Sequence, residues 1–135
     1  MSIPGVAVIS AFTFLAYIGV SNRFSSAKKP SSYAGLVPRM DISGDQIRYG
    51  RIKPGCIPIK SIILQTSWGL IRLNMQGPLK EFYQRLYQKI GKKKAAVATV
   101  RKLLETFYTM LKNKETYWPA DAIYVQRKLK QYALI

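Results

Sequence analysis

The sequence predicts a mainly α-helical domain, and three observations lead to that fold class. Hydrophobic residues make up 48% of the 135-residue chain, enough to build a packed core. Apolar residues recur at helical spacing through the second half of the chain, and Gly or Pro separates the periodic segments. The expected order is a helix-hairpin-helix-like start, an irregular basic loop or short hairpin, and then a packed set of three to four helices.

The first half contains two short expected helices and one non-helical segment. Pro is tolerated in a first helical turn, so the first helix is predicted to start at Pro4. Serine pairs suggest a short capped helix over 33–36. Between Met40 and Gly55 no helical period is present, and apolar residues alternate with Arg48 and Gly50, which predicts a short hairpin or an extended loop.

The second half is predicted to hold three helices in succession. The first runs from about 59 to 74, and Gly77-Pro78 interrupts the chain after it. The second runs from Pro78 to about Ile90 and stops at Gly91. The third, over 93–112, is the longest. One face of the second helix should carry Phe82, Leu86 and Ile90, and one stripe of the third should carry Val97, Val100, Leu104, Phe107 and Leu111.

These segments define one domain over residues 1–117. A basic tail over 118–135 follows it, with Asp121 as a candidate cap for a last helix that either docks or frays.

The charge balance points to a polyanionic partner. Lys and Arg number 22 against 6 Asp and Glu, which gives a formal net charge of +16. Such a chain is attracted to nucleic acid or to an anionic membrane surface. The absence of His and the single Cys exclude His-based catalysis, an intrachain disulfide and a Cys₄ metal site. The six acidic residues are scattered, so we predict no metal site and no cofactor within this chain.

The uncharged N-terminal stretch leaves two alternatives open. Residues 3–20 are long and apolar enough to nominate a membrane-spanning helix. Ser, Gly and Pro dilute the stretch, however, and no basic region precedes it as in a secretory signal. The other alternative is a core helix of a water-soluble domain.

The central basic segment carries the candidate chemistry. Ser43 precedes a flexible Gly44, and both lie among cations that suit the oxygens of a phosphodiester. Ser43 is therefore the candidate nucleophile. The plain alternative is an ordinary turn within a phosphate-docking surface. The candidate nucleic-acid ligands are Arg39, Gly44, Arg48, Arg51, Lys53, Lys60, the backbone at Gly5, and Lys92, Lys93 and Lys94 at the start of the longest helix, with Tyr33, Tyr49, Tyr83 and Tyr87 on the same face.

Several ordered blocks carry a family resemblance. They are SIPGVAVISA (2–11), the spaced F-x-SAK (24–28), SYAGLVPR (32–39), the Ser43-Gly44 pair, R-x-GRI (48–52) and the segment GKKKAAVATVRKLLETFYTML (91–111). Together they resemble the C-terminal transposase domain of the insertion-sequence 110/116/902 family, which includes the Piv-type DNA invertases. The resemblance covers about residues 2–117.

The resemblance implies a DNA recombinase that uses a nucleophilic serine, and Ser43 matches that serine. Full-length members carry an N-terminal RuvC-like domain whose carboxylates hold Mg²⁺; that domain is absent here, so the chain is expected to be inactive alone. The implied partners are DNA, a guide RNA and an oligomer with full-length transposase, in the prokaryotic cytoplasm at the nucleoid and not in a membrane.

The chain also departs from the family pattern. Ala7 replaces the second hairpin Gly, the loop after Arg51 is one residue short, and Ile59-Lys60 stands where the family tends to have Leu-Arg. Two alternatives therefore stay beside the recombinase: a non-catalytic basic nucleic-acid-binding module, and a small single-pass membrane protein with a helix over 3–20.

Overall fold

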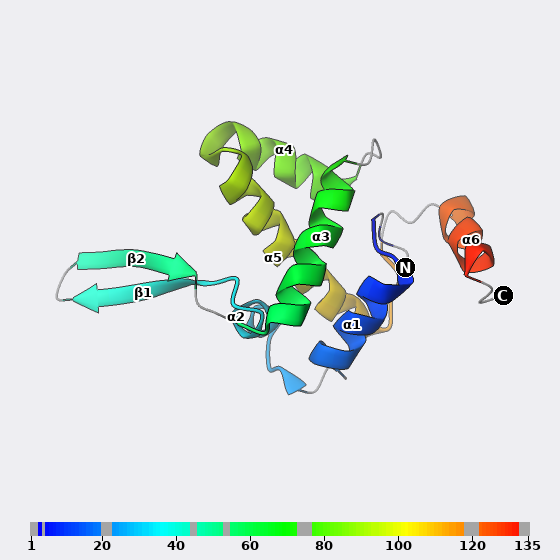
Figure 1. Cartoon of the computed structure of the whole chain (residues 1–135), viewed down its shortest axis with the longest axis horizontal. Coiled ribbons are helices and arrows are strands. Elements are labelled where there is room, and N and C mark those ends of the chain that lie inside the picture. The colour runs from blue at the N-terminus through cyan, green and yellow to red at the C-terminus, as the bar shows by residue number, and fades with distance from the viewer. Residues whose placement is uncertain are drawn as a thin grey trace.

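The chain folds into a helical body from which a two-stranded hairpin projects (Figure 1). The computed structural model describes residues 3, 5–19, 23–43, 46–52, 55–72, 77–117 and 122–132. The elements in chain order are α1 (Val8–Ile18), α2 (Lys29–Tyr33), β1 (Pro38–Ser43), β2 (Gln46–Ile52), α3 (Ile57–Arg72), α4 (Pro78–Ile90), α5 (Lys92–Asn113) and α6 (Ala122–Gln131). The predicted mainly α fold class is confirmed.

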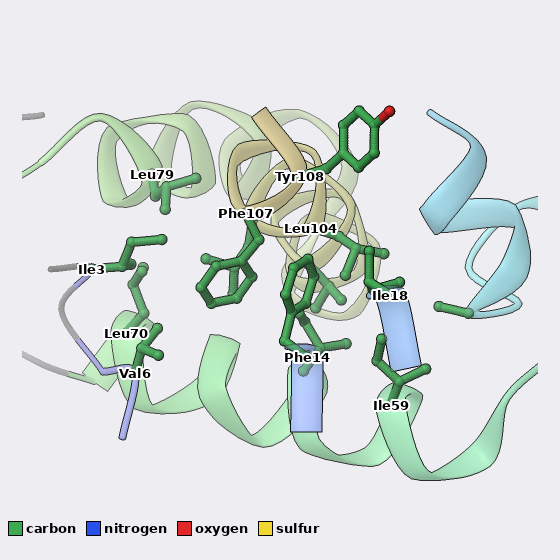
Figure 2. Close-up of a cluster of buried hydrophobic side chains, with 14 of the residues drawn as sticks. Ile3, Val6, Phe14, Ile18, Ile59, Leu70, Leu79, Leu104, Phe107 and Tyr108 are labelled. Atoms are coloured by element: carbon green, nitrogen blue, oxygen red, sulfur yellow. The ribbon is translucent and has the colours of Figure 1, made fainter. Parts of the chain in front are cut away.

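The core forms around α5. This helix packs against α2, α3 and α4, and α1 packs against α3. Figure 2 shows side chains of α1 and α3 turned toward Leu104 and Phe107 of α5. The rings of Phe14 and Phe107 lie 4.5 Å apart between centroids. The cluster thus joins residues that are more than ninety positions apart in the chain.

The predicted helical faces are only partly right. In α5 the buried set is wider than the predicted stripe, because neighbouring helices cover the helix along more than one face; it consists of Ala95, Ala96, Thr99, Val100, Leu103, Leu104, Phe107 and Tyr108. In α4 the predicted face is right only for Leu86, which packs against the cluster of Tyr83, Ala95 and Ala96. Leu79 and Tyr83 are the buried residues, and Ile90 is 43% exposed, so the face against α5 begins at Leu79 rather than at Phe82.

The first helix starts four residues later than predicted. Gly5 has a φ of +82°, and a Cβ there would lie 2.9 Å from the backbone nitrogen of Leu70. The chain therefore turns at Gly5 and packs on α3 before α1 begins at Val8. A helix over 3–20 is not formed. Within the described part of the chain, no helix combines the length and the apolar character needed to cross a bilayer.

Helix α1 places only part of its apolar surface in the core. Phe14 and Ile18 are buried, whereas Ile9 is 72% and Phe12 64% exposed. The prediction of a core helix is therefore correct for one face and wrong for the other.

The second helix lies before the predicted position. It spans Lys29–Tyr33 with Pro30 in its first turn, and it ends where the prediction had it begin. Gly35 has a φ of +67°, and the N–H of Leu36 donates to the carbonyl oxygen of Ser31 at 2.9 Å. A left-handed Gly after the last turn is a common helix stop, so the sequence signal at 33–36 marks an end and not a start.

The central hairpin is confirmed as an antiparallel pair. Asp41 pairs with Arg48, and Ser43 pairs with Gln46. The register shifts between Pro38, which pairs with Ile52, and Met40, which pairs with Tyr49. One extra residue therefore bulges out of β2 near the base of the hairpin, and such a bulge bends the ribbon.

The base of the hairpin is closed by a tight backbone contact with the end of α2. The N–H of Cys56 donates to the carbonyl oxygen of Tyr33 at 3.2 Å. A Cβ at Gly55 would lie 2.2 Å from the nitrogen of Gly35 and 2.3 Å from the carbonyl carbon of Ala34. No side chain can be accommodated at this distance. Gly55 is thus required where the chain leaves the hairpin and enters α3.

The later helices agree closely with the sequence. Helix α4 begins at Pro78, and Gly91 ends it with a φ of +79° and an N–H that donates to the carbonyl oxygen of Tyr87. Helix α6 occupies the predicted tail (Figure 1). The candidate cap Asp121 lies outside the described residues.

We expect Gly55→Ala to destabilise the fold. The added methyl group overlaps the backbone of residues 34–35, and forced overpacking of this kind costs about 1–3 kcal/mol. The melting temperature should fall by about 5–10 °C, because a domain of this size loses a few degrees per kcal/mol. Gly77→Ala is the matched control, since nothing lies within 4 Å of a Cβ at that glycine. Equal melting temperatures for the two variants would contradict this account.

A second prediction concerns stability at high pH. Burial raises the pKa of Tyr117 above its ordinary 10.0; a backbone hydrogen bond at Leu79 opposes the increase, and the carboxylate of Glu81 adds to it. The raised pKa means that the neutral phenol contributes stability below pH 10 and that this contribution is lost as the pH rises through the folded-state pKa.

Urea unfolding at pH 8 and pH 11 measures this loss. The parent should lose more unfolding free energy between the two pH values than Tyr117→Phe does. Tyr87→Phe removes a phenol that is 50% exposed and serves as the control. Equal losses in the parent and Tyr117→Phe would refute the assignment.

Candidate nucleic-acid interface

The hairpin brings four of the predicted site residues onto one ribbon. Arg39 and Ser43 lie in β1, and Arg48 and Arg51 lie in β2. Ser43 pairs with Gln46, so Arg48 occupies the diagonal position on the same face. Diagonal neighbours of this kind have Cα atoms about 7–8 Å apart, within reach of a long side chain. Residues that are five apart in sequence are thus neighbours across the ribbon.

The side chain of Arg48 is exposed and directed along the strand. Its Nη2 donates to Oε1 of Gln46 at 3.4 Å. Because Gln46 is the register partner of Ser43, this contact holds the guanidinium near the Ser43 end of the hairpin. A planar guanidinium in solvent beside this position is suited to hold a phosphate with two parallel hydrogen bonds.

The bulge sets the positions of the other two arginines. Because Met40 pairs with Tyr49 and Pro38 with Ile52, Gly50 and Arg51 together oppose Arg39. The backbone therefore places Arg39 and Arg51 next to each other at the base of the ribbon. Two further predicted ligands, Gly44 and Lys53, lie outside the described residues.

The remaining predicted ligands lie on the helical body. Lys60 stands in the first turn of α3, directly after the hairpin, and is half-buried. Gly5 packs against the backbone of Leu70, so the structure explains this glycine by close approach to α3. A phosphate contact at either residue stays a prediction.

Lys92, Lys93 and Lys94 open α5 and are exposed. No acidic residue lies in that first turn, and no side chain caps it. Lys92 and Lys93 do not line the hairpin. They line a groove together with Trp68 and Arg72 of α3.

The four tyrosines do not form one face with the cations. Tyr83 is buried against Ala95 and Ala96, and Tyr87 is exposed beside it with 5.9 Å between ring centroids. Tyr33 is half-buried at the base of the hairpin. The side chain of Tyr49 is outside the described part of the structure. The prediction that all four tyrosines share one face with the cations is therefore wrong, because Tyr83 is buried between α4 and α5.

The structure adds one cation that the sequence did not single out at the hairpin base. The guanidinium carbon of Arg23 lies 4.9 Å from the ring centroid of Tyr33 and 5.5 Å from that of Phe24. Its Nη1 donates to the carbonyl oxygen of Tyr17 at 2.8 Å. The hydroxyl of Tyr108 on α5 donates to the carbonyl oxygen of Phe24. This small aromatic cluster ties the segment before α2 to α5.

Among the residues whose placement is described, no three His, Cys, Asp or Glu side chains converge as metal ligands would. We derive no chemical step through a metal held by this part of the chain.

Comparison with known proteins decides the family. The family model described as the transposase IS116/IS110/IS902 family matches residues 1–84, well over half of the chain. The chain belongs to this transposase family. The matched residues lie in the N-terminal part of this chain, within the domain predicted over residues 1–117.

Two curated transposases are similar to this transposase chain. A transposase for insertion sequence element IS1111A from Coxiella burnetii is 28% identical over 119 residues, which cover 86% of this chain and 33% of the relative. A probable family 20 transposase from Pseudomonas aeruginosa is 25% identical over 122 residues, which cover 88% of this chain and 36% of the relative. The transposase chain thus spans about a third of the length of these relatives.

Proposed function

We propose that this chain is the DNA-binding C-terminal part of a transposase that uses Ser43 as its nucleophile in DNA transposition. The observation that carries the proposal is the register of the hairpin, which puts Arg48 on the diagonal of Ser43 and directs its guanidinium toward Gln46. The family membership supports transposition as the overall process.

The reaction is a transesterification at a phosphodiester. The Ser43 hydroxyl oxygen forms a bond to phosphorus, the bond from phosphorus to one DNA oxygen breaks, and the proton of the hydroxyl ends on that leaving oxygen. A phosphoserine link to one DNA strand and a free hydroxyl on the other fragment result. A serine hydroxyl is a weak nucleophile at its ordinary pKa, so it needs a positioned phosphate and a base.

The arginines supply the positioning. Charge that develops on the phosphate oxygens is stabilised by preorganised cationic donors, and Arg48 has the exposed, directed guanidinium that this role requires. Arg39 and Arg51, which oppose each other across the bulge in the strand register, are proposed to hold the backbone of the same DNA strand. Gly44 is proposed to let the DNA approach the hairpin end closely, because a glycine has no side chain.

The chain is proposed to depend on a second component for chemistry. The family resemblance assigns the carboxylates that hold Mg²⁺ to a RuvC-like domain outside this sequence. That domain, in an oligomer with full-length transposase, would complete the site on DNA, and a structured guide RNA would select it, at the nucleoid of a prokaryotic cell.

A second candidate is a nucleic-acid-binding module without chemistry. The exposed Arg48 of the hairpin and the exposed lysines at the start of α5 favour binding by themselves, whether or not Ser43 reacts. The two candidate functions differ in whether the Ser43 hydroxyl oxygen reacts with DNA, so the Ser43→Ala variant distinguishes them.

The binding prediction applies to both candidates. The purified chain should bind duplex DNA at low salt and lose affinity steeply as salt is added, because each neutralised phosphate releases a counterion. With about four to six phosphate contacts, affinity should fall by roughly 10²–10³-fold between 50 and 200 mM salt. Fluorescence anisotropy measures this slope. Affinity that does not change with salt would argue against a phosphate-binding surface.

The catalytic prediction uses the chain together with a full-length transposase of the family that carries Ser→Ala at its own nucleophile. The parent chain should form a covalent adduct with DNA that survives denaturing electrophoresis and maps to the Ser43 peptide. Ser43→Ala should bind DNA like the parent and form no adduct, since binding rests on many cations and chemistry on one oxygen.

Arg48→Ala should weaken DNA binding by about three- to tenfold and lower adduct formation further, because one charge-assisted contact is lost. Ser61→Ala and Arg85→Ala are the controls; both residues are exposed and lie on helices, outside the two strands. An adduct that persists in Ser43→Ala would identify a different nucleophile, and a parent chain that binds DNA without any adduct would favour the non-catalytic module.

A further inference from the structure

A groove with basic walls lies between the C-terminal half of α3 and the start of α5. It encloses about 670 Å³ and is lined by Gln65, Trp68, Gly69, Arg72, Lys92 and Lys93. None of these residues belongs to the hairpin, so the groove is separate from the Ser43 site. Three of the six are cations and none is acidic. A site of this size and charge suits an anionic ligand as large as a nucleotide.

The floor of the groove contains an indole ring. Trp68 is half-buried and packs against the cluster of Tyr83, Ala95 and Ala96. Packing on that side fixes the ring, and the lining of the groove includes its remaining surface. A fixed, partly exposed indole is a stacking platform for an unpaired base.

A lysine now occupies the position beside that ring. The Nζ of Lys92 lies 5.8 Å from the centroid of the Trp68 ring. This cation–π contact involves an exposed, flexible side chain and is worth only about 0.5–1 kcal/mol. A base can therefore displace the ammonium group, which would then meet the phosphate of the same nucleotide.

The glycine beside Trp68 has no packing explanation. Gly69 lies inside α3, where Gly costs about 1 kcal/mol relative to Ala. Among the residues that the structure describes, a Cβ there would meet only the carbonyl oxygen of Gly5, at an ordinary contact distance of 3.9 Å. The packing of the fold would thus accept alanine. Gly69 lines the groove next to Trp68.

We propose that this groove binds an unpaired segment of nucleic acid, with one base stacked on Trp68 and the flanking phosphates on Arg72, Lys92 and Lys93. Unpaired nucleic acid is favoured over a duplex because paired bases are stacked on each other and offer no free face to an indole. The inference goes beyond the proposed function, since it requires neither Ser43 nor the hairpin.

The experiment measures the fluorescence of the Trp68 indole directly. The chain has two Trp residues, so the full chain with Trp118→Phe reports on Trp68 alone. Titration with an eight-nucleotide oligothymidylate at low salt should give saturable quenching of the Trp68 fluorescence. Quenching that is absent, or equally strong with a blunt duplex of the same length, would overturn the proposal.

Variants in the same background test the lining residues. Arg72→Ala combined with Lys93→Ala should weaken the oligonucleotide by about tenfold or more, and both residues are exposed, so the fold should be retained. Lys89→Ala combined with Lys112→Ala removes two cations of α4 and α5 outside the groove and should change affinity by less than threefold. Equal effects of the two double variants would show general charge attraction and refute the groove.

Three further measurements distinguish nucleotide binding in this groove from other modes of binding. Trp68→Leu, followed by anisotropy of a labelled oligonucleotide, should weaken binding by at least fivefold if stacking contributes. Oligoglutamate should not quench Trp68 at the concentrations that suffice for oligothymidylate; equal quenching would point to an acidic peptide and overturn the proposal. Arg48→Ala should leave the quenching of Trp68 unchanged. The proposal for the groove and the proposed function of the hairpin can therefore fail independently of each other.

Discussion

The burial of α5 is the constraint on which the rest of the structure depends. Val100, Leu103 and Leu104 are fully buried, and burial of such side chains contributes about 1.5–3 kcal/mol each. Helices α2, α3 and α4 all pack on this one helix, and α1 reaches it through the contact of Phe14 with Phe107. The short helix α2 is held on α5, and the hairpin is held on α2 by the contact of Gly55 with Gly35. The position of the hairpin therefore depends on the core, because α2 packs on α5 and the hairpin is joined to the end of α2.

Two described places carry part of the positive charge, and they differ in geometry. The hairpin projects from the helical body (Figure 1), and its strands contain Arg39, Arg48 and Arg51, which suits contact with a DNA backbone. The groove between α3 and α5 is recessed, and it combines lysines and an arginine with an indole. At the hairpin base the described rings of Phe24 and Tyr33 contact Arg23 and not a cation of the strands, whereas in the groove the indole of Trp68 lines the same space as Arg72, Lys92 and Lys93. This difference is the physical reason for assigning them to different forms of nucleic acid.

The candidate site shows how far sequence reasoning reaches. The ordered motifs singled out Ser43 and the arginines around it as candidates, and the alternation from Ile47 to Gly50 indicated the hairpin, because both signals lie within a few residues of one another. The groove was missed, although Gln65, Trp68, Gly69 and Arg72 have the spacing of one helical face. Its second wall comes from Lys92 and Lys93, more than twenty residues later, and only the packing of α3 on α5 joins the two.

The sequence by itself determined the mainly α fold class, the transposase family and the local breaks in the chain. Gly77-Pro78 and Gly91 separate helices where predicted, because a missing N–H or a left-handed φ acts on the backbone without help from the rest of the fold. Only the tertiary structure decided which faces are buried and where the first two helices lie. The turn at Gly5 packs on α3, and the end of α2 packs on Gly55, so those boundaries follow from contacts between segments far apart in the chain. Likewise Leu79 and Tyr83 are the buried residues of α4. The period of the sequence alone does not determine this buried face, because it also depends on how α4 packs against α5.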